Sequence, residues 1–272
     1  MGKVGWFGKV SFVLLIFYMA HNLLLLGCTS ISCIVFVDVG QGDGAIIKIE
    51  DDFLAVIDGG PSVDYVHKIS KYIDMDDEID LLIITHMHRD HYLGVLEILK
   101  RYKVNTLVLP TSCIKAPEVL SVLEDVNVSD IKYTDFVTIK SSSSNTSVSY
   151  GKNIDECFIS HEDVNDSSVI VDLELENSSV LFMGDVESKR EMKFLEEYHK
   201  DVYILKAGHH CSSSSTSKEF LDAVTPDVVV CSYGKNNSYG HPHKEVLDRF
   251  VSMGINVLSN AQQGDIVINL DK

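Results

Sequence analysis

The 272-residue sequence is short of positive charge: 23 lysines and arginines stand against 40 aspartates and glutamates, a formal net charge of −17. Affinity for the phosphate backbone of nucleic acids comes largely from lysine and arginine. A broad basic surface for gripping nucleic acid is therefore excluded, and any such contact has to be local. A metal centre can supply the missing positive charge at such a place.

Paired cysteine motifs are also missing. The six cysteines show no CxxC pair and no zinc-finger spacing, so they do not define a disulfide framework. Cys33, Cys157 and Cys231 lie in strand-like surroundings and are interpreted as small buried hydrophobic residues. The sequence shows no internal repeat and no linker that would divide it, so residues 34–272 are expected to form one domain with one substantial core.

The first 28 residues predict a targeting or anchoring segment. Basic residues precede an apolar run at 10–20, and a second apolar run at 23–27 leads to Cys28. This pattern predicts a signal peptide of the lipoprotein type, with Cys28 as the lipidated residue. The alternative is an uncleaved membrane anchor, because residues 10–27 are marginally long enough to span a membrane. Either way, residues 34–272 would lie outside the cytoplasm, secreted or tethered to a membrane.

A dense group of ionisable side chains follows a hydrophobic strand at 81–85. His86, His88, Asp90 and His91 fall within six positions, just before a helical pattern. Alternate residues at a strand end can point the same way, so His86 and His88 can face one ion while Asp90 and His91 face a second. Two divalent metal ions are therefore predicted. Zinc is expected first, with manganese or iron as alternatives, since nitrogen and oxygen ligands do not select sharply among them.

From residue 34 onward, strands alternate with helices. Helices are predicted at 63–75, 93–102, 116–126, 188–200, 218–224 and 244–253. Strands are predicted at 34–39, 45–50, 53–57, 81–85, 104–109, 169–175, 179–183, 202–206, 227–232, 256–258 and 265–270, with further strand between 131 and 182. Polar residues recur at the strand ends: Asp58, His86, Asp185, His209 and His241. Such residues gather along one edge of a sheet, where α/β proteins commonly build their sites.

The polar strand ends complete a candidate two-metal site. Two ions roughly 3.5 to 4 Å apart can bridge a water, lower its pKa and polarise the bond under attack. Asp185 is the natural carboxylate between them, the alternative being that it caps the helix at 188. Either His209 or His210 can supply one more ligand, with the other supporting it or contacting substrate. Asp58 is expected to orient a ligand through a hydrogen bond.

Seven stretches occur in this order along the chain: VDVGQGDGAI, VIDGG, ITHMHRDHYLG, NDSSVIVDLE, FMGDVE, LKAGHHCSSSST and SYGKNNSYGHPHKEVLDRF. They resemble the metallo-β-lactamase-fold hydrolases, and within that family the nuclease-like C-terminal domain of ComEC-type competence proteins and its stand-alone relatives. The resemblance covers nearly everything after residue 34. It implies an α/β fold, an αββα sandwich of two mixed sheets flanked by helices, with a two-metal hydrolytic site on one edge.

The resemblance also implies roles for individual residues. The implied metal ligands are His86 and His88 for one ion, Asp90 and His91 for the other, Asp185 between them, and His209 or His210 to complete the second site. Catalytic roles fall to Asp90 and to His241, which would face the substrate and stabilise charge on a phosphoryl oxygen. The residues expected to support a ligand, shape the site or contact substrate are Asp43, Asp58, His161, Asn237 and Tyr239.

Three positions depart from the family pattern. His88 stands where the competence-type domains usually have aspartate, so this metal site looks more like the general family pattern. His161 is the only histidine between the ligand turn and Asp185, where many members carry a further ligand. Cys211 stands where a glycine is expected after the paired histidines, which leaves ligation by its thiol open.

These inferences predict a metal-dependent hydrolase that uses a metal-bridged hydroxide, most simply a phosphodiesterase or nuclease acting on DNA. With at most one membrane span, the chain itself is no DNA-conducting channel, but it could accompany one in DNA uptake. The alternatives are hydrolysis of another phosphodiester (phosphocholine or a cell-wall polymer), hydrolysis of an amide or thioester, and a non-catalytic metal-binding module. The expected partners are the substrate and, through the N-terminal segment, a membrane; no obligate protein partner is predicted.

Overall fold

The computed structural model describes residues 32–50, 53–111, 128–142, 145–151 and 164–270, together with Ser121. The segment predicted as signal peptide or anchor, most of the helix expected at 116–126, and His161 lie outside these residues. Within the described part of the chain, no helix has both the length and the apolar character that a membrane crossing requires.

The first sheet contains seven strands, six from the first half of the described chain and one from its end. The strands are β1 (Cys33–Phe36), β2 (Ala45–Ile49), β3 (Phe53–Ile57), β4 (Glu78–Ile83), β5 (Lys103–Leu109), β6 (Val128–Tyr133) and β14 (Ile266–Asn269). Their order is β14-β1-β2-β3-β4-β5-β6. Pairing is antiparallel from β14 to β3 and parallel from β3 to β6, so the sheet is mixed.

The second sheet also contains seven strands and is also mixed. The strands are β7 (Phe136–Ser142), β8 (Asn145–Tyr150), β9 (Ile170–Glu174), β10 (Ser179–Phe182), β11 (Ile204–Lys206), β12 (Val228–Cys231) and β13 (Asn256–Ser259). Their order is β13-β12-β11-β10-β9-β7-β8. The strands β10 to β13 are parallel, and β9 and β10 form the antiparallel hairpin that the sequence predicts.

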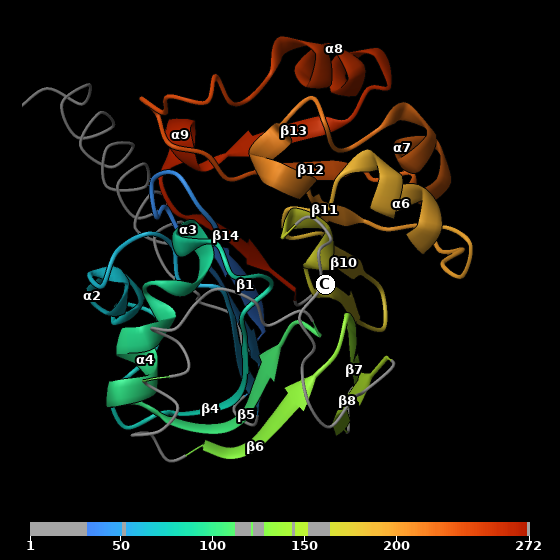
Figure 1. Cartoon of the computed structure of the whole chain (residues 1–272). Helices are drawn as coiled ribbons and strands as arrows, with labels where there is room; N and C mark the ends of the chain where they lie inside the picture. Colours follow the sequence, from blue (N-terminus) through green and yellow to red (C-terminus); the bar gives the residue numbers. More distant parts are fainter. Residues whose placement is uncertain are drawn as a thin grey trace, which may run out of the picture.

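Short helices cover the outer face of each sheet and produce four layers (Figure 1). The first sheet carries α2 (Tyr65–Ile69), α3 (Arg89–Tyr92) and α4 (Val95–Arg101), and the second carries α6 (Ser188–Phe194), α7 (Lys218–Val224) and α8 (Lys244–Ser252). The remaining elements are α9 (Asn260–Gln263) and the 3-10 turns η1 (Asn165–Ser167) and η2 (Gly208–Cys211). The αββα sandwich expected from the sequence is confirmed.

Successive side chains of a strand point to opposite faces of its sheet, and this divides the apolar side chains among three hydrophobic cores. In and just after β4, Leu81 and Ile83 point between the two sheets, while Leu82 and Ile84 pack beneath α2 and α4. Strand β10 repeats the pattern between the sheets and beneath the helices of the second sheet. Because both faces of these strands are covered, they are apolar throughout and are held in one register.

Three helices differ from their predicted limits by more than one residue. The helix expected at 63–75 is confined to α2, Tyr65–Ile69. The helix expected at 188–200 ends at Phe194, after which the amides of Glu196 and Glu197 bond to carbonyls three residues back, a tighter turn than the α-helix. The helix expected at 93–102 begins only at Val95, and Gly94, its N-cap, lies against the backbone of Gly59. A Cβ at Gly94 would come within 2.0 Å of the Gly59 carbonyl oxygen, so only glycine fits there.

Candidate metal centre

The candidate centre lies along one edge, where strands of both sheets end. The histidine turn at 86–91 follows β4 of the first sheet. Asp185 follows β10, and the turn η2 with His209 and His210 follows β11, both in the second sheet. Between β10 and Asp185, Gly184 takes a φ of 52°, which favours glycine and turns the chain sharply into the edge. The centre is therefore assembled from the two sheets together.

His86, His88 and Asp185 form the first cluster. Nε2 of His86 lies 3.1 Å from Nδ1 of His88 and 3.6 Å from Oδ2 of Asp185. Burial, together with His91 beside it, lowers the pKa of His86 well below its usual value, so the ring is neutral at neutral pH. A neutral imidazole offers a nitrogen lone pair to a metal ion. The cluster therefore suits one divalent cation.

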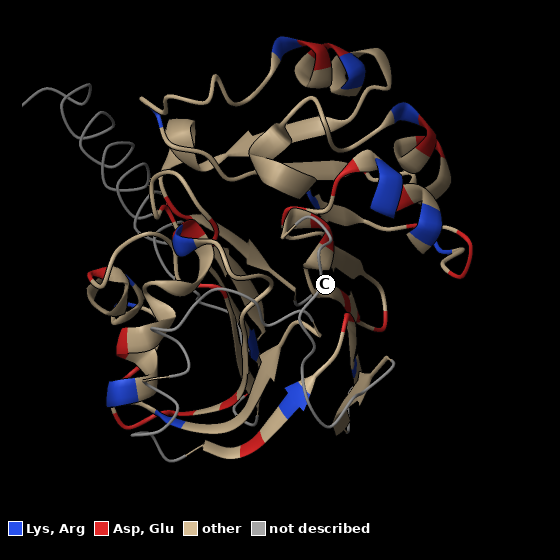
Figure 2. Cartoon of the chain, viewed as in Figure 1, with Lys and Arg blue, Asp and Glu red and all other residues tan. Residues whose placement is uncertain are grey.

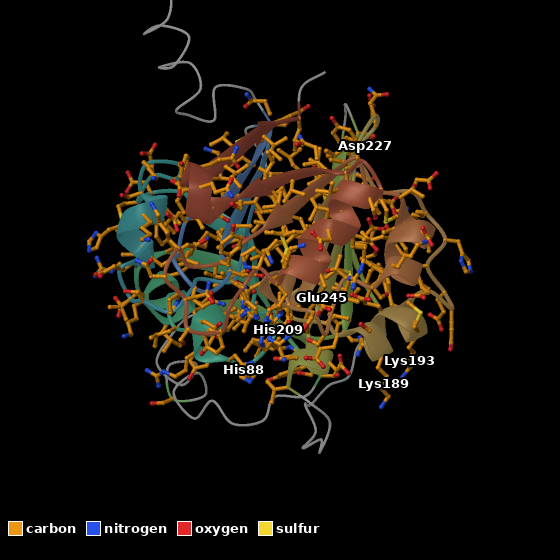
Figure 3. All side chains as sticks on the ribbon, turned by 90° about the horizontal axis from the view of Figure 1, so that it is seen from above. His88, Lys189, Lys193, His209, Asp227 and Glu245 are labelled. Carbon is orange, nitrogen blue, oxygen red and sulfur yellow. A yellow bond between two sulfur atoms is a disulfide. The ribbon has the colours of Figure 1, made fainter. Side chains whose placement is uncertain are left out.

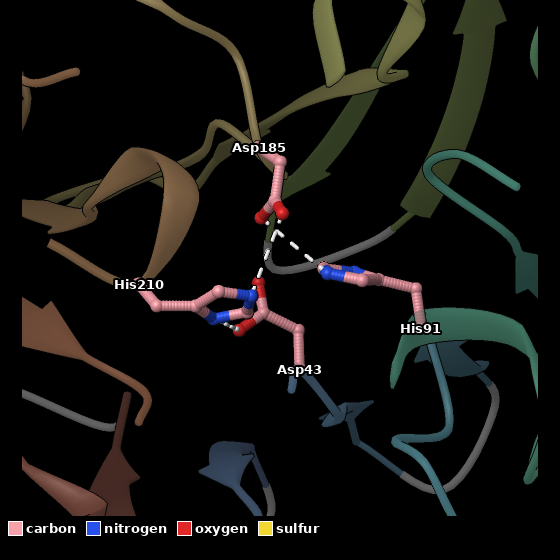
Figure 4. A group of neighbouring side chains, drawn as sticks. All are labelled: Asp43, His91, Asp185 and His210. Carbon is pink, nitrogen blue, oxygen red and sulfur yellow. Dashed lines mark ion pairs between the residues drawn. The ribbon is translucent and has the colours of Figure 1, made fainter. Parts of the chain in front are cut away.

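His91, Asp185 and His210 form the second cluster, with Asp43 beside it (Figure 4). Nε2 of His91 lies 3.4 Å from Oδ1 of Asp185, and Nε2 of His210 lies 3.4 Å from Oδ2 of Asp185. These two nitrogens and Asp185 Oδ1 are buried and make no hydrogen bond to any described residue. Buried polar atoms normally have partners, so three that face one another without one indicate a cation site.

The outward nitrogen of each ring in the second cluster has a hydrogen-bond acceptor. Nδ1 of His91 lies 2.8 Å from Oδ2 of Asp58, and Nδ1 of His210 lies 2.9 Å from the carbonyl oxygen of Ser232. Because a carboxylate and a carbonyl accept hydrogen bonds, each Nδ1 donates and each Nε2 is directed at the centre. The amide and hydroxyl of Thr85 in turn donate to Asp58. This is the support that metal-binding histidines typically have.

Asp43 lies behind His210. Its Oδ1 is 3.3 Å from His210 Nδ1, the nitrogen that faces away from Asp185, and its Oδ2 accepts a hydrogen bond of 2.6 Å from Lys206 Nζ. Burial raises the pKa of Asp43, but Lys206 and His210 outweigh it and lower the pKa to about 2. Asp43 Oδ1 makes no hydrogen bond to any described residue, so an ionised Asp43 places negative charge beside His210, and Lys206 holds Asp43. The sequence pattern does not single out Lys206, which ends an apolar strand and is nearly fully buried.

Asp185 is shared between the clusters. Its Oδ1 faces His91, and its Oδ2 faces His86 and His210. Burial raises its pKa, but His210 and His91 outweigh that effect and hold it well below the usual value. Burial likewise lowers the pKa of His91 and His210, yet Asp185 overcomes it and raises both. Without a metal the centre thus attracts protons, and its nitrogen and oxygen donors fit divalent ions such as zinc, manganese or iron.

Asp90 and His209 lie at the opening of the second cluster. Oδ2 of Asp90 is 3.4 Å from His210 Nε2, and its side chain is 29% exposed. His209 is 24% exposed, with Nε2 4.0 Å from Asp185 Oδ2 and Nδ1 3.2 Å from Glu187. His210 is only 2% exposed. Of the paired histidines, His210 lies within the cluster, while His209 borders it.

The loop between β12 and α8 forms another side of the opening. The ring of His241 lies 5.7 Å from that of His209 and 5.9 Å from that of His210, measured between centroids. Asn237 holds this loop: its side-chain oxygen accepts from the amides of Tyr239 and His241, and its side-chain nitrogen donates to two loop carbonyls. The ring of His241 is therefore held in place beside both paired histidines.

Gln41 determines which nitrogen of His241 carries the proton. Burial, with His210 and His209 nearby, lowers the pKa of His241 to about 4, so the ring is neutral at neutral pH. The side-chain oxygen of Gln41 accepts from the Gly234 amide, which leaves its nitrogen to donate to His241 Nδ1 at 3.4 Å. The proton of His241 then resides on Nε2. No spacing in the sequence pointed to Gln41.

Cys211 and Cys231 form a disulfide bond, which corrects two expectations. Cys231 is not a free hydrophobic residue, and Cys211 has no thiol to offer a metal. Cys33 is disulfide-bonded as well, so its interpretation as a free hydrophobic residue is also wrong. Twenty residues separate Cys211 from Cys231, and their contact arises because η2 and the end of β12 lie side by side. Cys157 lies outside the described residues.

Known proteins resemble this chain in sequence. ComE operon protein 3 of Bacillus subtilis (strain 168) is 32% identical over 201 residues, which cover 70% of this chain and 24% of that protein. Competence protein ComA of Neisseria gonorrhoeae is 32% identical over 123 residues, 44% of this chain and 17% of that protein. Recombination protein 2 of Haemophilus influenzae is 34% identical over 105 residues, 39% of this chain and 13% of that protein. The chain thus matches about a quarter or less of these relatives' lengths.

A structural comparison and a family model agree with these sequence matches. A solved structure of a CmlA beta-hydroxylase mutant superposes with a TM-score of 0.50 at 15% identity, covering 89% of this chain and 54% of that one, which shows likeness of fold alone. A family model described as the metallo-beta-lactamase superfamily matches residues 37–235. That range contains every side chain of both clusters. The chain therefore belongs to the metallo-beta-lactamase superfamily.

Proposed function

We propose that this chain is a two-metal phosphodiesterase that cleaves DNA outside the cytoplasm. The observation that carries the proposal is the position of Asp185, which directs one oxygen toward His91 and the other toward His86 and His210. Two divalent ions bound in such clusters supply hydroxide at neutral pH and neutralise charge on the group under attack. Superfamily membership supports hydrolysis, and the phosphodiester specificity is our inference.

The chain's own residues take distinct parts in this reaction. Asp185 lies between the clusters, and Asp58 and the carbonyl of Ser232 keep the rings of His91 and His210 aimed at them. Asp90, partly exposed at the opening, completes the second ligand set and lies on the side from which substrate enters. His241 donates a hydrogen bond from Nε2 to a phosphoryl oxygen; because the ring is neutral, it acts as a donor rather than as a positive charge.

An exposed aromatic ring favours a nucleic acid over other phosphodiesters. Tyr239 is 65% exposed, and its ring lies nearly parallel to that of His241, 18° apart with centroids separated by 5.7 Å. Stacking of a nucleobase on an aromatic side chain contributes about 1–3 kcal/mol and requires an unpaired base. We therefore expect single-stranded DNA to be preferred over duplex, with one base stacked on Tyr239.

Local positive charge is available on α6, which begins three residues after Asp185. Its exposed Lys189 and Lys193 are one helical turn apart, and α6 is among the basic segments in Figure 2. Figure 3 shows both lysines to one side of His88 and His209. A strand that leaves the centre in this direction would have cations for its phosphates although the chain as a whole is acidic.

Location outside the cytoplasm has two supports. Disulfide bonds form and persist in oxidising compartments, and the described residues include Cys211–Cys231 and the bonded Cys33. The sequence pattern of residues 1–28 predicts a signal peptide or anchor. The similarity to proteins named for competence and recombination supports a role in processing DNA during its uptake.

The test uses two substrates, a single-stranded oligonucleotide and bis-p-nitrophenyl phosphate, with the purified protein and manganese or zinc. We expect metal-dependent cleavage of both. Tyr239→Ala should lose about tenfold or more on the oligonucleotide, as one lost stacking contact implies, and keep its rate on the small ester. Tyr203→Ala is the matched control, since Tyr203 is 49% exposed but precedes β11 at the far end from the centre.

Each alternative has its own outcome. Absence of cleavage of both phosphodiesters with either metal would contradict the proposal. Hydrolysis of nitrocefin in their place would favour amide or thioester substrates. Cleavage of the small ester alone would favour another phosphodiester, such as a phosphocholine or cell-wall polymer. Fewer than one bound metal per chain, with no turnover of any substrate, would favour a non-catalytic module.

A further inference from the structure

The disulfide bond joins the two segments that position His210. On one side, Cys211 directly follows His210 in η2 and is fully buried. On the other side, Cys231 ends β12 and directly precedes Ser232, whose carbonyl oxygen accepts the hydrogen bond from His210 Nδ1. The covalent link therefore fixes the spacing between the ring of His210 and the group that orients it.

Cys211 also contacts the loop that carries His241. Its carbonyl oxygen accepts a hydrogen bond of 3.1 Å from the amide of His243, two residues beyond His241. The ring of His243 accepts in turn from the amide of Ser213 at 2.8 Å. A shift of Cys211 would thus reach both the second cluster and the loop beside it.

The backbone of η2 has a conformation that its residues do not favour. His209, His210 and Cys211 have φ angles of 47°, 55° and 62°, the left-handed region in which side chains other than glycine are strained. Three consecutive residues of this kind persist only when their surroundings hold them. The bond to Cys231 is the covalent part of those surroundings.

We propose that the Cys211–Cys231 bond is the positioning element of the second cluster: it holds His210 in the orientation in which Nε2 meets Asp185, and its reduction weakens metal binding there while leaving the His86–His88 cluster intact. The inference rests on the proposed two-metal function. It makes metal loading depend on the redox state of the compartment, so a dithiol or phosphine reductant would inactivate the protein without unfolding it.

Reduction of the Cys211–Cys231 bond is a two-electron reaction. A dithiol reduces the bond to two thiols and is itself oxidised to a disulfide; a phosphine does so with one water and becomes the phosphine oxide. Neither reaction changes any ligand atom of the first cluster. What changes is the tether between η2 and β12, so the ring of His210 keeps its chemistry and loses its fixed orientation.

The experiment compares metal affinity at the two clusters. Cobalt(II) is titrated against a competing chelator and followed by its visible spectrum, which reports the geometry of each occupied site. The test protein is Cys211→Gly/Cys231→Ser, because glycine accepts the φ of residue 211 and no free thiol remains to bind cobalt. The control is Cys33→Ser treated with iodoacetamide, which removes the bond at the start of β1, blocks the thiol that this substitution frees and leaves Cys211–Cys231 in place. Wild-type protein reduced with a phosphine, treated with iodoacetamide and desalted is a second test.

We expect the double variant and the reduced protein to bind one cobalt ion as the wild type does and the other about 10- to 100-fold more weakly, the range for loss of an orienting contact. Thermal unfolding should show that the fold persists. Unchanged affinity at both sites would overturn the inference, as would an equal loss at both, because the bond would then stabilise the domain generally. A wild-type protein that binds no metal would overturn the proposed function as well.

Discussion

The two clusters share Asp185 but differ in how their other side chains are held. In the second cluster, Nδ1 of His91 and of His210 have acceptors at 2.8 and 2.9 Å. In the first cluster, Nδ1 of His86 has only the weaker contact of 3.2 Å with the Thr85 hydroxyl, and His88 is the least buried member. Hydrogen bonds to the outward nitrogen orient metal-binding rings and raise affinity. The comparison indicates a tightly held ion in the second cluster and a weaker one in the first.

The two clusters also differ in whether all their expected ligands lie within the described residues. The sequence leaves His161 as the histidine that could complete it, and this residue lies outside the described part of the chain. The second cluster lies wholly within the described residues, as a group of Asp43, His91, Asp185 and His210 that could hold an ion. We therefore expect stepwise loading, with the second cluster filled first. Five substitutions, in four experiments, test this difference.

The largest effect is expected from Asp185→Asn, which removes the carboxylate common to both clusters. Both ions should be lost from the purified protein. Because the metals contribute several kcal/mol to the transition state, kcat/KM on bis-p-nitrophenyl phosphate should fall by more than about 1000-fold. Asp172→Asn is the control, a buried carboxylate in β9 paired with Lys200. Two retained ions and a rate within about tenfold of the wild type would contradict the shared role of Asp185.

The next effect separates the clusters directly. His210→Ala should abolish the tighter of two metal-binding steps, whereas His88→Ala should abolish the weaker one. Dialysis against a chelator, followed by metal analysis, measures the difference: the His88 variant should retain about one ion per chain and the His210 variant close to none. If both variants retained the same amount, the two clusters would not differ in the way their hydrogen bonds suggest.

A smaller effect is expected from Asp58→Asn. The carboxylate of Asp58 accepts hydrogen bonds from Nδ1 of His91 and from the amide and hydroxyl of Thr85. Loss of its charge should lower the affinity of the second cluster for its ion by about 10- to 100-fold, while the affinity of the first cluster changes little. Isothermal titration of the metal-free protein resolves the two steps. A loss confined to the weaker binding step would assign Asp58 to the first cluster.

Thr85→Val should have the smallest effect. Valine keeps the shape of the side chain and removes a hydroxyl that lies 2.7 Å from Asp58 and 3.2 Å from His86. One such hydrogen bond contributes about 0.5–1.5 kcal/mol, so each binding step should weaken by no more than about tenfold. Serine keeps the hydroxyl that valine removes, so Thr85→Ser is expected to match the wild type and serves as the control.

The fold and the segments of the centre could be predicted because they depend on local patterns. Apolar strands that end in polar residues, such as β4 before His86, place those residues at a sheet edge by geometry alone. The limits of helices were less certain. The need for glycine just before α4 arises from the close approach of Gly94 to Gly59, a contact between residues 35 positions apart in sequence.

The remaining features depend on contacts between distant segments or on backbone angles. Neither composition nor spacing shows that the side chain of Lys206 turns inward to reach Asp43, 163 positions away. The positive φ values of η2 turn His209 and His210 in different directions, so their order in the sequence could not tell which one lies inside the cluster. The Cys211–Cys231 pair follows from the adjacency of β11 and β12, which no cysteine motif encodes.

The return of β14 to the first sheet has a consequence for biosynthesis. Ile34 in β1 pairs with Ile268, so one edge of the first sheet stays open until nearly all of the described chain has been made. Contacts this distant in sequence slow folding, because a long loop must close before they form. Exposed strand edges also invite pairing with other chains. Under the location that we propose, both difficulties would arise outside the cytoplasm, after translocation.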